Sequence, residues 1–432
     1  MRERVDILLR EIAALVTMDQ GAVPRAGGEA QALGRIDDGA IAIRGDRIAG
    51  VGSTDEICRR YEATPDRVIS LPGSTVLPGF IDPHTHVLFA GSRDHEFSMR
   101  LEGRSYMEIA AMGGGILSSV KAFRDASDDK ILSQTRARLD QMLSHGVTTI
   151  EAKSGYGLDS RHEIRALKLL DILDEEHPID ILTTLLGAHD IPPDYRDRRE
   201  SYVREIVDEM IPAAASQTRV RFCDVFCEKG VFTPQEARTI LETGRRHGLT
   251  PRLHADEFAP SGASELAGEI RAVSADHLME ASDEGLAALK RAGTIAILLP
   301  ATTFSMGSRR YAPAGKISSL GIPIALATDC NPGSSMTTNL PLVLTLAVLE
   351  MKMSVAEALT AVTVNAAHSL GLAGEVGRLA PGLLADLQVL PASNPAAIVY
   401  HLGGLAPSRV MKRGRWVIEG TRLASAGKTR NT

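Results

Sequence analysis

The sequence predicts an α/β protein: a (β/α)8 or TIM barrel joined to a small β-sandwich that both ends of the chain build. In the middle of the chain, residues 75–372, eight apolar strand-like runs alternate with amphipathic helical stretches. Residues 1–74 and 373–432 contain short strand-like runs and turns instead. No glycine-rich dinucleotide turn follows the first middle strand, which disfavours the alternative of an open doubly wound sheet.

The β-sandwich is predicted from the strand patterns at the two ends of the chain. Gly45 and Asp46 mark the turn of a hairpin, and residues 20–38, rich in Gly, Ala and Gln, read as a loop. Because both β-rich ends flank one barrel, the economical arrangement packs them together. The predicted strand regions are 41–52, 67–71, 382–390 and 410–420.

The barrel elements are predicted from the alternation in the middle region. The strands are expected at 76–82, 146–152, 179–186, 220–226, 250–254, 272–277, 294–299 and 322–329. The helices are expected between them, at 128–145, 161–176, 201–215, 234–247 and 282–292. Functional residues of such a barrel lie at the carboxyl ends of its strands.

Composition and charge exclude several classes of function. The 432 residues are 44% hydrophobic, which is ample for a large core. The net charge is −6 and no basic run with interleaved aromatics occurs, so we expect no nucleic-acid partner. No apolar run reaches the roughly 18 residues of a membrane span, and no signal-peptide core is present. The four irregularly spaced cysteines favour a reducing, cytoplasmic location, with Cys223 and Cys227 as small buried side chains.

Two histidines follow the first predicted barrel strand. His84 and His86 are spaced i, i+2, so on an extended segment they point to the same face. On a barrel strand that face is the interior, where two neutral imidazoles make half of a zinc-type site. A lone His-x-His pattern is weak evidence, so this interpretation depends on ligands from other strands.

Three further predicted strands end in groups that can complete such a site. His254 ends the fifth strand, His277 the sixth and Asp329 the eighth. Each alone has an ordinary explanation, because a strand-end histidine is usually structural and Asp329 can cap the following helix. Five such groups at four strand ends on one rim are hard to explain in that way. The sequence therefore predicts a metal site.

This set of strand-end residues resembles that of the amidohydrolase superfamily, and the surrounding motifs more closely resemble the imidazolonepropionase family of histidine degradation. The resemblance spans about residues 39–420. The motif HADE alone is not specific, since cytosine deaminases carry a similar one. The matching motifs are FIDPHTH at 80–86, FAGSR at 89–93, GGGI at 113–116, EAKSGYG at 151–157, LGAH at 186–189, HADE at 254–257 and TDCNPGS at 328–334.

The resemblance implies a hydrolase with one zinc or iron ion per subunit. The ion would lower the pKa of bound water from about 16 toward 7, and the hydroxide would attack the ring carbonyl of 4-imidazolone-5-propanoate. Opening the lactam C–N bond gives N-formimidoyl-L-glutamate. The implied metal ligands are His84, His86, His254 and Asp329. The implied catalytic groups are Glu257, His277 and Asp329, and which of them is the principal base stays open.

The implied substrate carries a carboxylate, and the resemblance also implies the residues that contact it. Arg93 suits a carboxylate because a guanidinium donates two parallel hydrogen bonds. Tyr156 is placed just past the fourth strand, between glycines that permit an unusual turn. His189 is expected as a donor to the substrate carbonyl or carboxylate. The full implied set is Arg93, Tyr156, His189, Glu257, Asn331, Gly333 and Ser334.

Several alternatives stay open at this point. In binuclear amidohydrolases such as dihydroorotases a carboxylated lysine bridges two metals, but the resemblance to a mononuclear branch favours a structural or substrate-facing Lys153. Residues 113–115 can form a mobile loop over the site or a plain connection. A cytosine- or guanine-type deaminase would not need Arg93, and a non-catalytic barrel would be expected to lack a ligand. The family also implies a homodimer.

Overall fold

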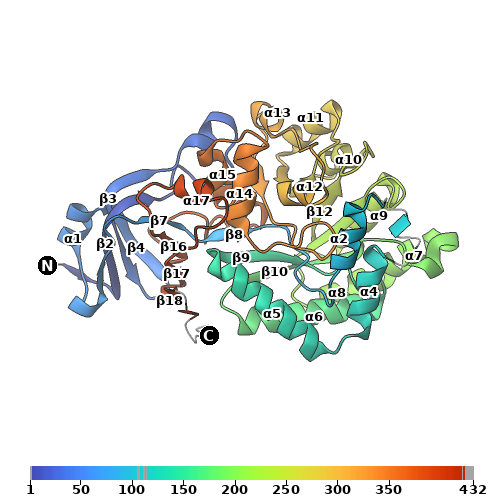
Figure 1. Ribbon diagram of the computed structural model, residues 1–432, viewed down its shortest axis with the longest axis horizontal. Coiled ribbons are helices and arrows are strands. Elements are labelled where there is room, and N and C mark those ends of the chain that lie inside the picture. Colours follow the sequence, from blue (N-terminus) through green and yellow to red (C-terminus); the bar gives the residue numbers. More distant parts are fainter. Residues whose placement is uncertain (1, 105–107, 110–111, 113, 421, 424–432) are drawn as a thin grey trace.

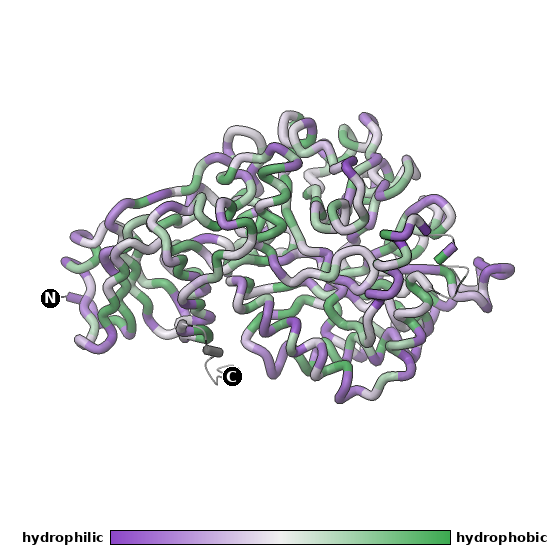
Figure 2. The backbone as a smooth tube through the Cα atoms, viewed as in Figure 1, coloured by the Kyte–Doolittle hydropathy of each residue, from purple (hydrophilic) through white to green (hydrophobic). Residues whose placement is uncertain are grey.

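The computed structural model describes residues 2–104, 108–109, 112, 114–420 and 422–423, so Gly113 lies outside the described residues. It consists of a parallel barrel sheet surrounded by helices and a second sheet beside it, which holds strands from both chain ends (Figure 1). Hydrophobic residues gather in the strands and hydrophilic residues on the outer turns (Figure 2). The predicted α/β barrel with a β-rich part from both termini is confirmed.

Eight parallel strands form the barrel sheet in the order β15-β14-β13-β12-β11-β10-β9-β8. Each predicted strand region overlaps one of them, although the first and the last are much shorter than expected. Nearly all of their side chains are buried, whichever face of the sheet they point to, as expected for a sheet that helices cover. The strands are β8 (Phe80–Asp82), β9 (Val147–Lys153), β10 (Asp180–Ala188), β11 (Phe222–Cys227), β12 (Thr250–Ala255), β13 (Ser274–His277), β14 (Ile295–Leu298) and β15 (Ile324–Leu326).

The prediction of one strand over residues 76–82 was wrong, because the chain passes there from one sheet to the other. β7 (Thr75–Pro78) belongs to the second sheet, and only β8 belongs to the barrel. Gly79 joins them, and its N–H donates to the carbonyl of Asp386. A Cβ at Gly79 would lie 2.4 Å from the side chain of Thr148, so the crossing requires glycine.

The predicted helices are present, and most begin at a capping side chain. Ser127, Asp159, Thr233 and Ser282 each accept a hydrogen bond from a backbone N–H of the first turn. The helices they begin are α5 (Asp128–Ser144), α6 (Ser160–Glu176), α9 (Pro234–Arg246) and α11 (Asp283–Ala292). The helix predicted at 201–215 comprises α7 (Arg199–Glu205), the π-helical turn η4 (Ile206–Met210) and α8 (Ile211–Gln217).

Further helices connect the strands and cover the barrel. No helix among the described residues has the length and apolar character needed to cross a membrane. These helices are α2 (Asp94–Leu101), α4 (Ile116–Asp125), α10 (Ala263–Glu269), α12 (Pro300–Ser305), α13 (Ala314–Ser319), α14 (Leu340–Leu349), α15 (Val355–Ala361), α16 (Val364–Ser369) and α17 (Ala397–Tyr400).

The second sheet joins the two ends of the chain strand by strand. Its order is β19-β18-β17-β16-β7-β2-β3-β4, with β6 paired to β2. The predicted hairpin is β3 and β4, but residues 20–38 are not all loop, since they include η1 (Gly27–Gln31) and the start of β3. The remaining bounds are β1 (Glu3–Arg4), β2 (Ile7–Val16), β3 (Arg35–Arg44), β4 (Arg47–Ser53), α1 (Thr54–Arg60), β5 (Tyr61–Glu62), η2 (Pro65–Arg67), β6 (Val68–Ser70), β16 (Leu387–Leu390), β17 (Arg409–Lys412), β18 (Arg415–Glu419) and β19 (Arg422–Leu423).

The first and last barrel strands meet through the segments that follow them. The backbone N–H and hydroxyl of Thr328 donate to the carboxylate of Asp82, at 3.1 and 2.6 Å. The N–H of Asp329 donates to the carbonyl of His84, and the N–H of His86 donates to the carbonyl of Cys330, both at 3.1 Å. These bonds bring the segments after β8 and β15 together at the carboxyl end of the barrel.

Candidate active site

The four predicted metal ligands converge at the carboxyl ends of β8, β12 and β15. His84 Nε2 and His86 Nε2 each lie 3.5 Å from Asp329 Oδ1. His254 Nε2 lies 3.3 Å from His86 Nε2. All four side chains are buried. The predicted strand ends therefore do bring three imidazoles and one carboxylate to a single point.

The unpaired nitrogens at this point fit a bound cation. His84 Nε2 is buried and has no hydrogen-bond partner within the described part of the chain. The Nε2 atoms of His86 and His254 face each other, although two unprotonated ring nitrogens cannot hydrogen bond. A buried polar atom without a partner costs about 1–3 kcal/mol. Imidazole nitrogens and a carboxylate form a common metal donor set, so these residues fit a metal ion.

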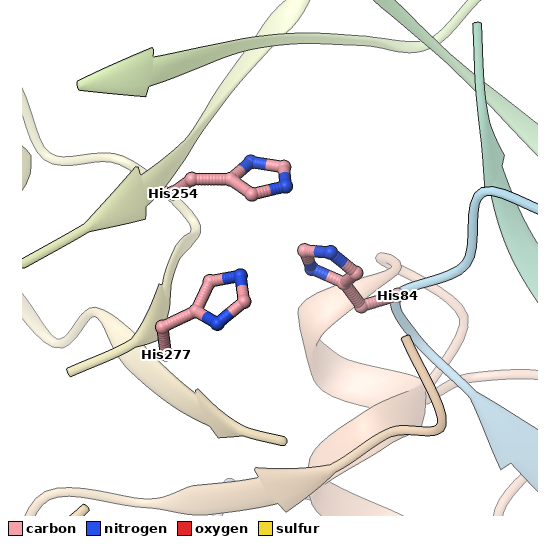
Figure 3. Close-up of side chains that lie close together, drawn as sticks. All are labelled: His84, His254 and His277. Atoms are coloured by element: carbon pink, nitrogen blue, oxygen red, sulfur yellow. The ribbon is translucent and has the colours of Figure 1, made fainter. Parts of the chain in front are cut away.

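His277 forms a second, overlapping group with two of these histidines. The ligand atoms of His84, His254 and His277 all lie within 4.8 Å of one another, as do those of His84, His86 and Asp329. The three imidazoles face a common space, with His84 opposite the other two (Figure 3). The centroid of the His84 ring lies 4.6 Å from that of His254 and 5.6 Å from that of His277.

Buried carboxylates lie next to the Nδ1 atoms of two of the candidate metal ligands, His84 and His254. His84 Nδ1 lies 2.6 Å from Asp276 Oδ2, and His254 Nδ1 lies 3.0 Å from Asp224 Oδ2. A carboxylate at Nδ1 keeps the proton there and leaves the Nε2 lone pair directed at the site. The sequence analysis did not identify Asp224 or Asp276. Asp224 lies on β11 and Asp276 on β13. Their contacts with His254 and His84 form only when these strands lie in the folded sheet.

Lys153 lies beneath the metal ligands in a network of buried charges. Its Nζ lies 2.8 Å from Glu151 Oε1 and 2.8 Å from Asp224 Oδ2, and none of the three side chains is exposed. Burial alone would lower the pKa of Lys153, but Asp224 and Glu151 outweigh it and raise that pKa. Lys153 is thus a buried cation paired with two carboxylates, an arrangement that fits a structural interpretation.

Tyr156 follows the second barrel strand, β9, and the prediction that it follows the fourth was wrong. β9 pairs with β8, and the described segment between them contains helices and no strand. Lys153 ends the same second strand. The predicted strand over residues 146–152 is itself the second of the eight expected, so the fourth place was a numbering error and not a difference in the strands.

A pocket of about 110 Å³ lies over the candidate metal ligands. Every predicted substrate contact lines it: Arg93, Tyr156, His189, Glu257, Asn331, Gly333 and Ser334. The pocket wall also includes Glu96 and Arg100, which the sequence analysis missed. These two residues follow Arg93 at i+3 and i+7, so a helical-face analysis of α2 would have grouped them.

Three buried acid–base groups border the pocket. Glu257 Oε2 lies 3.7 Å from His277 Nε2. Burial, and then the charge of Asp329, raises the pKa of Glu257 well above its usual value, whereas burial lowers the pKa of His277. Burial raises the pKa of Asp329 to about 6. A hydrogen bond that Thr302 Oγ1 donates to Asp329 Oδ2 lowers this pKa, but its effect is smaller than that of burial. His277 and Asp329 adopt positive φ values, 79° and 53°, as strained residues at functional sites often do.

His189 presents an acceptor to the pocket. Its Nδ1 lies 2.9 Å from the carbonyl oxygen of Gly155, which can only accept, so Nδ1 carries a proton. Burial lowers the pKa of His189 to about 3, so the ring is neutral and Nε2 is unprotonated. The geometry thus differs from the expectation that His189 donates to the substrate.

A buried carboxylate shapes the loop that carries Tyr156. Glu163 of α6 accepts hydrogen bonds from the N–H groups of Gly155, Gly157 and Leu158, the last two at 2.7 and 2.9 Å. Gly155 adopts φ of +106°, which an L side chain would strain. The loop holds the Tyr156 phenol in the pocket, and burial raises the pKa of that phenol, so it stays protonated.

Arg93 is already paired within the protein. Its Nε and Nη2 both donate to Glu96 Oε2, at 2.9 and 2.8 Å. The other oxygen of Glu96 accepts from the N–H of Gly115 and the hydroxyl of Ser118. A Cβ at Gly333 would lie 2.3 Å from Arg93 Nη1, so the glycine lets the guanidinium approach this loop.

Asn331 organises the loop after β15. Its Oδ1 accepts from the N–H groups of Gly333 and Ser334, at 2.8 and 2.7 Å. Its Nδ2 donates to the carbonyl of Asp329 at 2.7 Å. Both polar atoms of the side chain are thus used within the loop, which fixes the pocket wall next to Asp329.

Comparisons with known proteins show the family to which the chain belongs. Two family models match, the amidohydrolase family over residues 236–417 and the bacterial imidazolonepropionase-like composite domain over residues 39–61. The imidazolonepropionase of Geobacillus kaustophilus is 47% identical to this chain, over 95% of the chain and 98% of its own length. The imidazolonepropionase of Symbiobacterium thermophilum is 45% identical, over 96% and 98%.

Solved structures share the fold at much lower identity. An adenosine deaminase from Xanthomonas campestris matches with a TM-score of 0.71 and 16% identity, over 99% of this chain and 96% of its own. An atrazine chlorohydrolase from Arthrobacter aurescens matches with a TM-score of 0.69 and 19% identity, over 97% of both chains. These structures show the fold alone, whereas the curated relatives show the family. The chain belongs to the imidazolonepropionase family of hydrolases.

Proposed function

We propose that this chain hydrolyses 4-imidazolone-5-propanoate to N-formimidoyl-L-glutamate in histidine degradation, with one zinc or iron ion per subunit. One observation supports the proposal beyond family membership: a single pocket is lined both by three of the candidate metal ligands, His86, His254 and Asp329, and by a wall that contains arginines. A small cyclic amide with a carboxylate tail requires both features. Deamination of a neutral base would not need the arginines, so the pocket favours the hydrolase over the deaminase.

The metal would be held by His84, His86, His254 and Asp329. When bound, it supplies Lewis acidity and water of lowered pKa at neutral pH. Three imidazoles and a carboxylate accept zinc or iron, so this donor set does not select between them. Asp276 and Asp224 hold His84 and His254 in the tautomer that a metal requires.

The residues of the chain would then orient the ring and move its protons. Hydrolysis adds water across the lactam bond: the carbonyl carbon gains oxygen, the C–N bond breaks and the ring nitrogen gains a proton. Glu257 has a raised pKa and faces His277, so this pair can hold a proton near the ring. His189 Nε2 accepts a hydrogen bond, which suits a ring N–H, and the Tyr156 phenol can donate one.

Hydrolysis by purified, metal-loaded protein tests the proposal. We expect loss of the substrate absorbance with wild type and a decrease of about 100-fold or more in kcat for Glu257→Gln, because acid–base groups contribute about 10²–10⁴-fold. Equal metal content in the two proteins is the control. A folded, metal-loaded wild type without hydrolysis would overturn the proposed function.

A cytoplasmic location and a homodimer complete the proposal. The four cysteines of the chain are free, as expected in a reducing compartment. The dimer rests on the family resemblance, and light scattering of the purified protein measures it.

A further inference from the structure

Arg100 is the second arginine of the pocket wall, at the last turn of α2. Its side chain is half-buried. Its Nη2 donates to the carbonyl of Gly333 at 3.1 Å, and its guanidinium carbon lies 5.6 Å from the centroid of the Phe97 ring. Neither partner carries a charge. Most of its five N–H donors have no partner among these contacts.

Arg100 gives this wall a positive charge that no acidic side chain among the described residues pairs with. Arg93 directs both Nε and Nη2 to one oxygen of Glu96, so that pair contributes no net charge. Arg100 makes no ion pair with any acidic side chain of the described residues. Among the described residues of this wall, Arg100 is therefore a positive charge without an ion-pair partner.

The surroundings of Arg100 favour an anionic ligand. Burial, and then the charge of Arg93, lowers the pKa of Arg100, which means that the pocket wall opposes its positive charge. Arginine nevertheless stays protonated at neutral pH. A carboxylate bound there would relieve this cost and accept charge-assisted hydrogen bonds.

Arg93 and Arg100 approach the same residue. Arg93 Nη1 lies against Gly333, and Arg100 Nη2 donates to the Gly333 carbonyl. Gly333 belongs to the loop that begins at the candidate metal ligand Asp329. A ligand held between the two arginines therefore lies at the end of a loop anchored at the metal site.

We propose that Arg100 supplies the positive charge by which the pocket selects the carboxylate of its substrate, while Arg93, neutralised by Glu96, fixes the geometry. This inference rests on the proposed function, since the carboxylate is that of the proposed substrate. Arg100 is a specificity-determining residue in this assignment and takes no part in the acid–base steps.

Two ligands that differ in charge at one group test this inference. The probes are 3-(imidazol-4-yl)propanoate and its primary amide, with affinities measured by calorimetry on metal-loaded protein. Wild type is expected to prefer the acid. Arg100→Gln keeps a donor for the Gly333 carbonyl. We expect its affinity for the acid to fall by about tenfold or more, and its affinity for the amide to stay within about twofold of the wild-type value. Arg100→Lys is expected to retain much of the preference.

Arg104→Gln is the matched control, because Arg104 is exposed, lies just after α2 and does not line the pocket. Its acid-to-amide ratio should equal that of wild type. Thermal melting of each variant checks folding. In kinetics, Arg100→Gln should raise KM for the imidazolone with little change in kcat.

An Arg100→Gln protein that keeps the wild-type ratio would overturn the inference. Failure of the proposed function gives a different result, because it is measured as lack of hydrolysis by wild type. A wild type that prefers the acid but hydrolyses nothing, with the preference lost in Arg100→Gln, would support Arg100 as the carboxylate-binding residue and reject the reaction.

Discussion

The floor and the wall of the pocket are built in different ways. The floor consists of His84, His254 and neighbouring strand-end groups, fully buried over a network of paired charges. The wall consists of α2 and the loop after β15, where Arg100 is half-buried and its charge is unpaired among the described residues. The supporting charges of the floor are therefore paired within the protein, whereas the wall presents a charge without an ion-pair partner among the described residues. This difference parallels the two proposed roles, metal binding for the floor and substrate selection for the wall.

Removing the cation beneath the floor should have the largest effect. Lys153→Met leaves Glu151 and Asp224 buried without their 2.8 Å partner. Breaking a buried ion pair costs about 3–5 kcal/mol, and we expect a loss of that size in the free energy of unfolding, measured with denaturant. The exposed pair of Lys121 with Asp125 provides the control, and Lys121→Met should cost about 0–1 kcal/mol. Equal losses in the two variants would contradict a floor organised by buried charge.

An intermediate effect is expected at the carboxylate behind His84. Asp276→Asn removes the charged acceptor that lies 2.6 Å from His84 Nδ1. Such partners of metal ligands are worth about 10–100-fold in metal affinity, so chelator competition should show a loss of that size. Asp283→Asn, on the exposed start of α11, is the control. Unchanged affinity in Asp276→Asn would mean that His84 does not depend on this contact.

The smallest effect is expected in the wall. Gly333→Ala places a Cβ 2.3 Å from Arg93 Nη1, but the guanidinium can move away because it ends a flexible side chain. We expect KM for the imidazolone to rise by about threefold to tenfold, with kcat and melting temperature nearly unchanged. Gly315→Ala, which meets no atom within 4 Å, is the control. A large drop in kcat instead would show that wall and floor are coupled.

Sequence reasoning predicted which strand-end side chains converge, because this convergence follows from strand periodicity. His84, His86, His254, His277 and Asp329 end apolar runs, and parallel strands bring such ends together. The wall was harder to predict, because it depends on helix faces and on a loop that comes from a distant part of the chain. Arg93 was expected from the motif, but its pairing with Glu96 depends on the position at which α2 begins.

The supporting charges could not be predicted for a different reason. Asp224 and Lys153 lie on different strands, and their contact follows from the stagger of the closed sheet. Periodicity shows that a residue faces the interior, but not which residue on another strand it meets. The assignment of Tyr156 to the fourth strand was a miscount, since the expected strand at 146–152 is the second of the eight in both the sequence and the structure.

The way in which the second sheet is assembled has a consequence for synthesis of the chain. β7 lies between β2 and β16, and it pairs with β16 along residues 75–78 and 387–390. When the ribosome has made β7, its partner is still hundreds of residues away. A nascent chain must therefore carry an open strand edge, which is a template for aggregation, until the whole barrel has been translated. A chain truncated before Leu387 would therefore keep β7 without its partner β16 and would have an incomplete sheet.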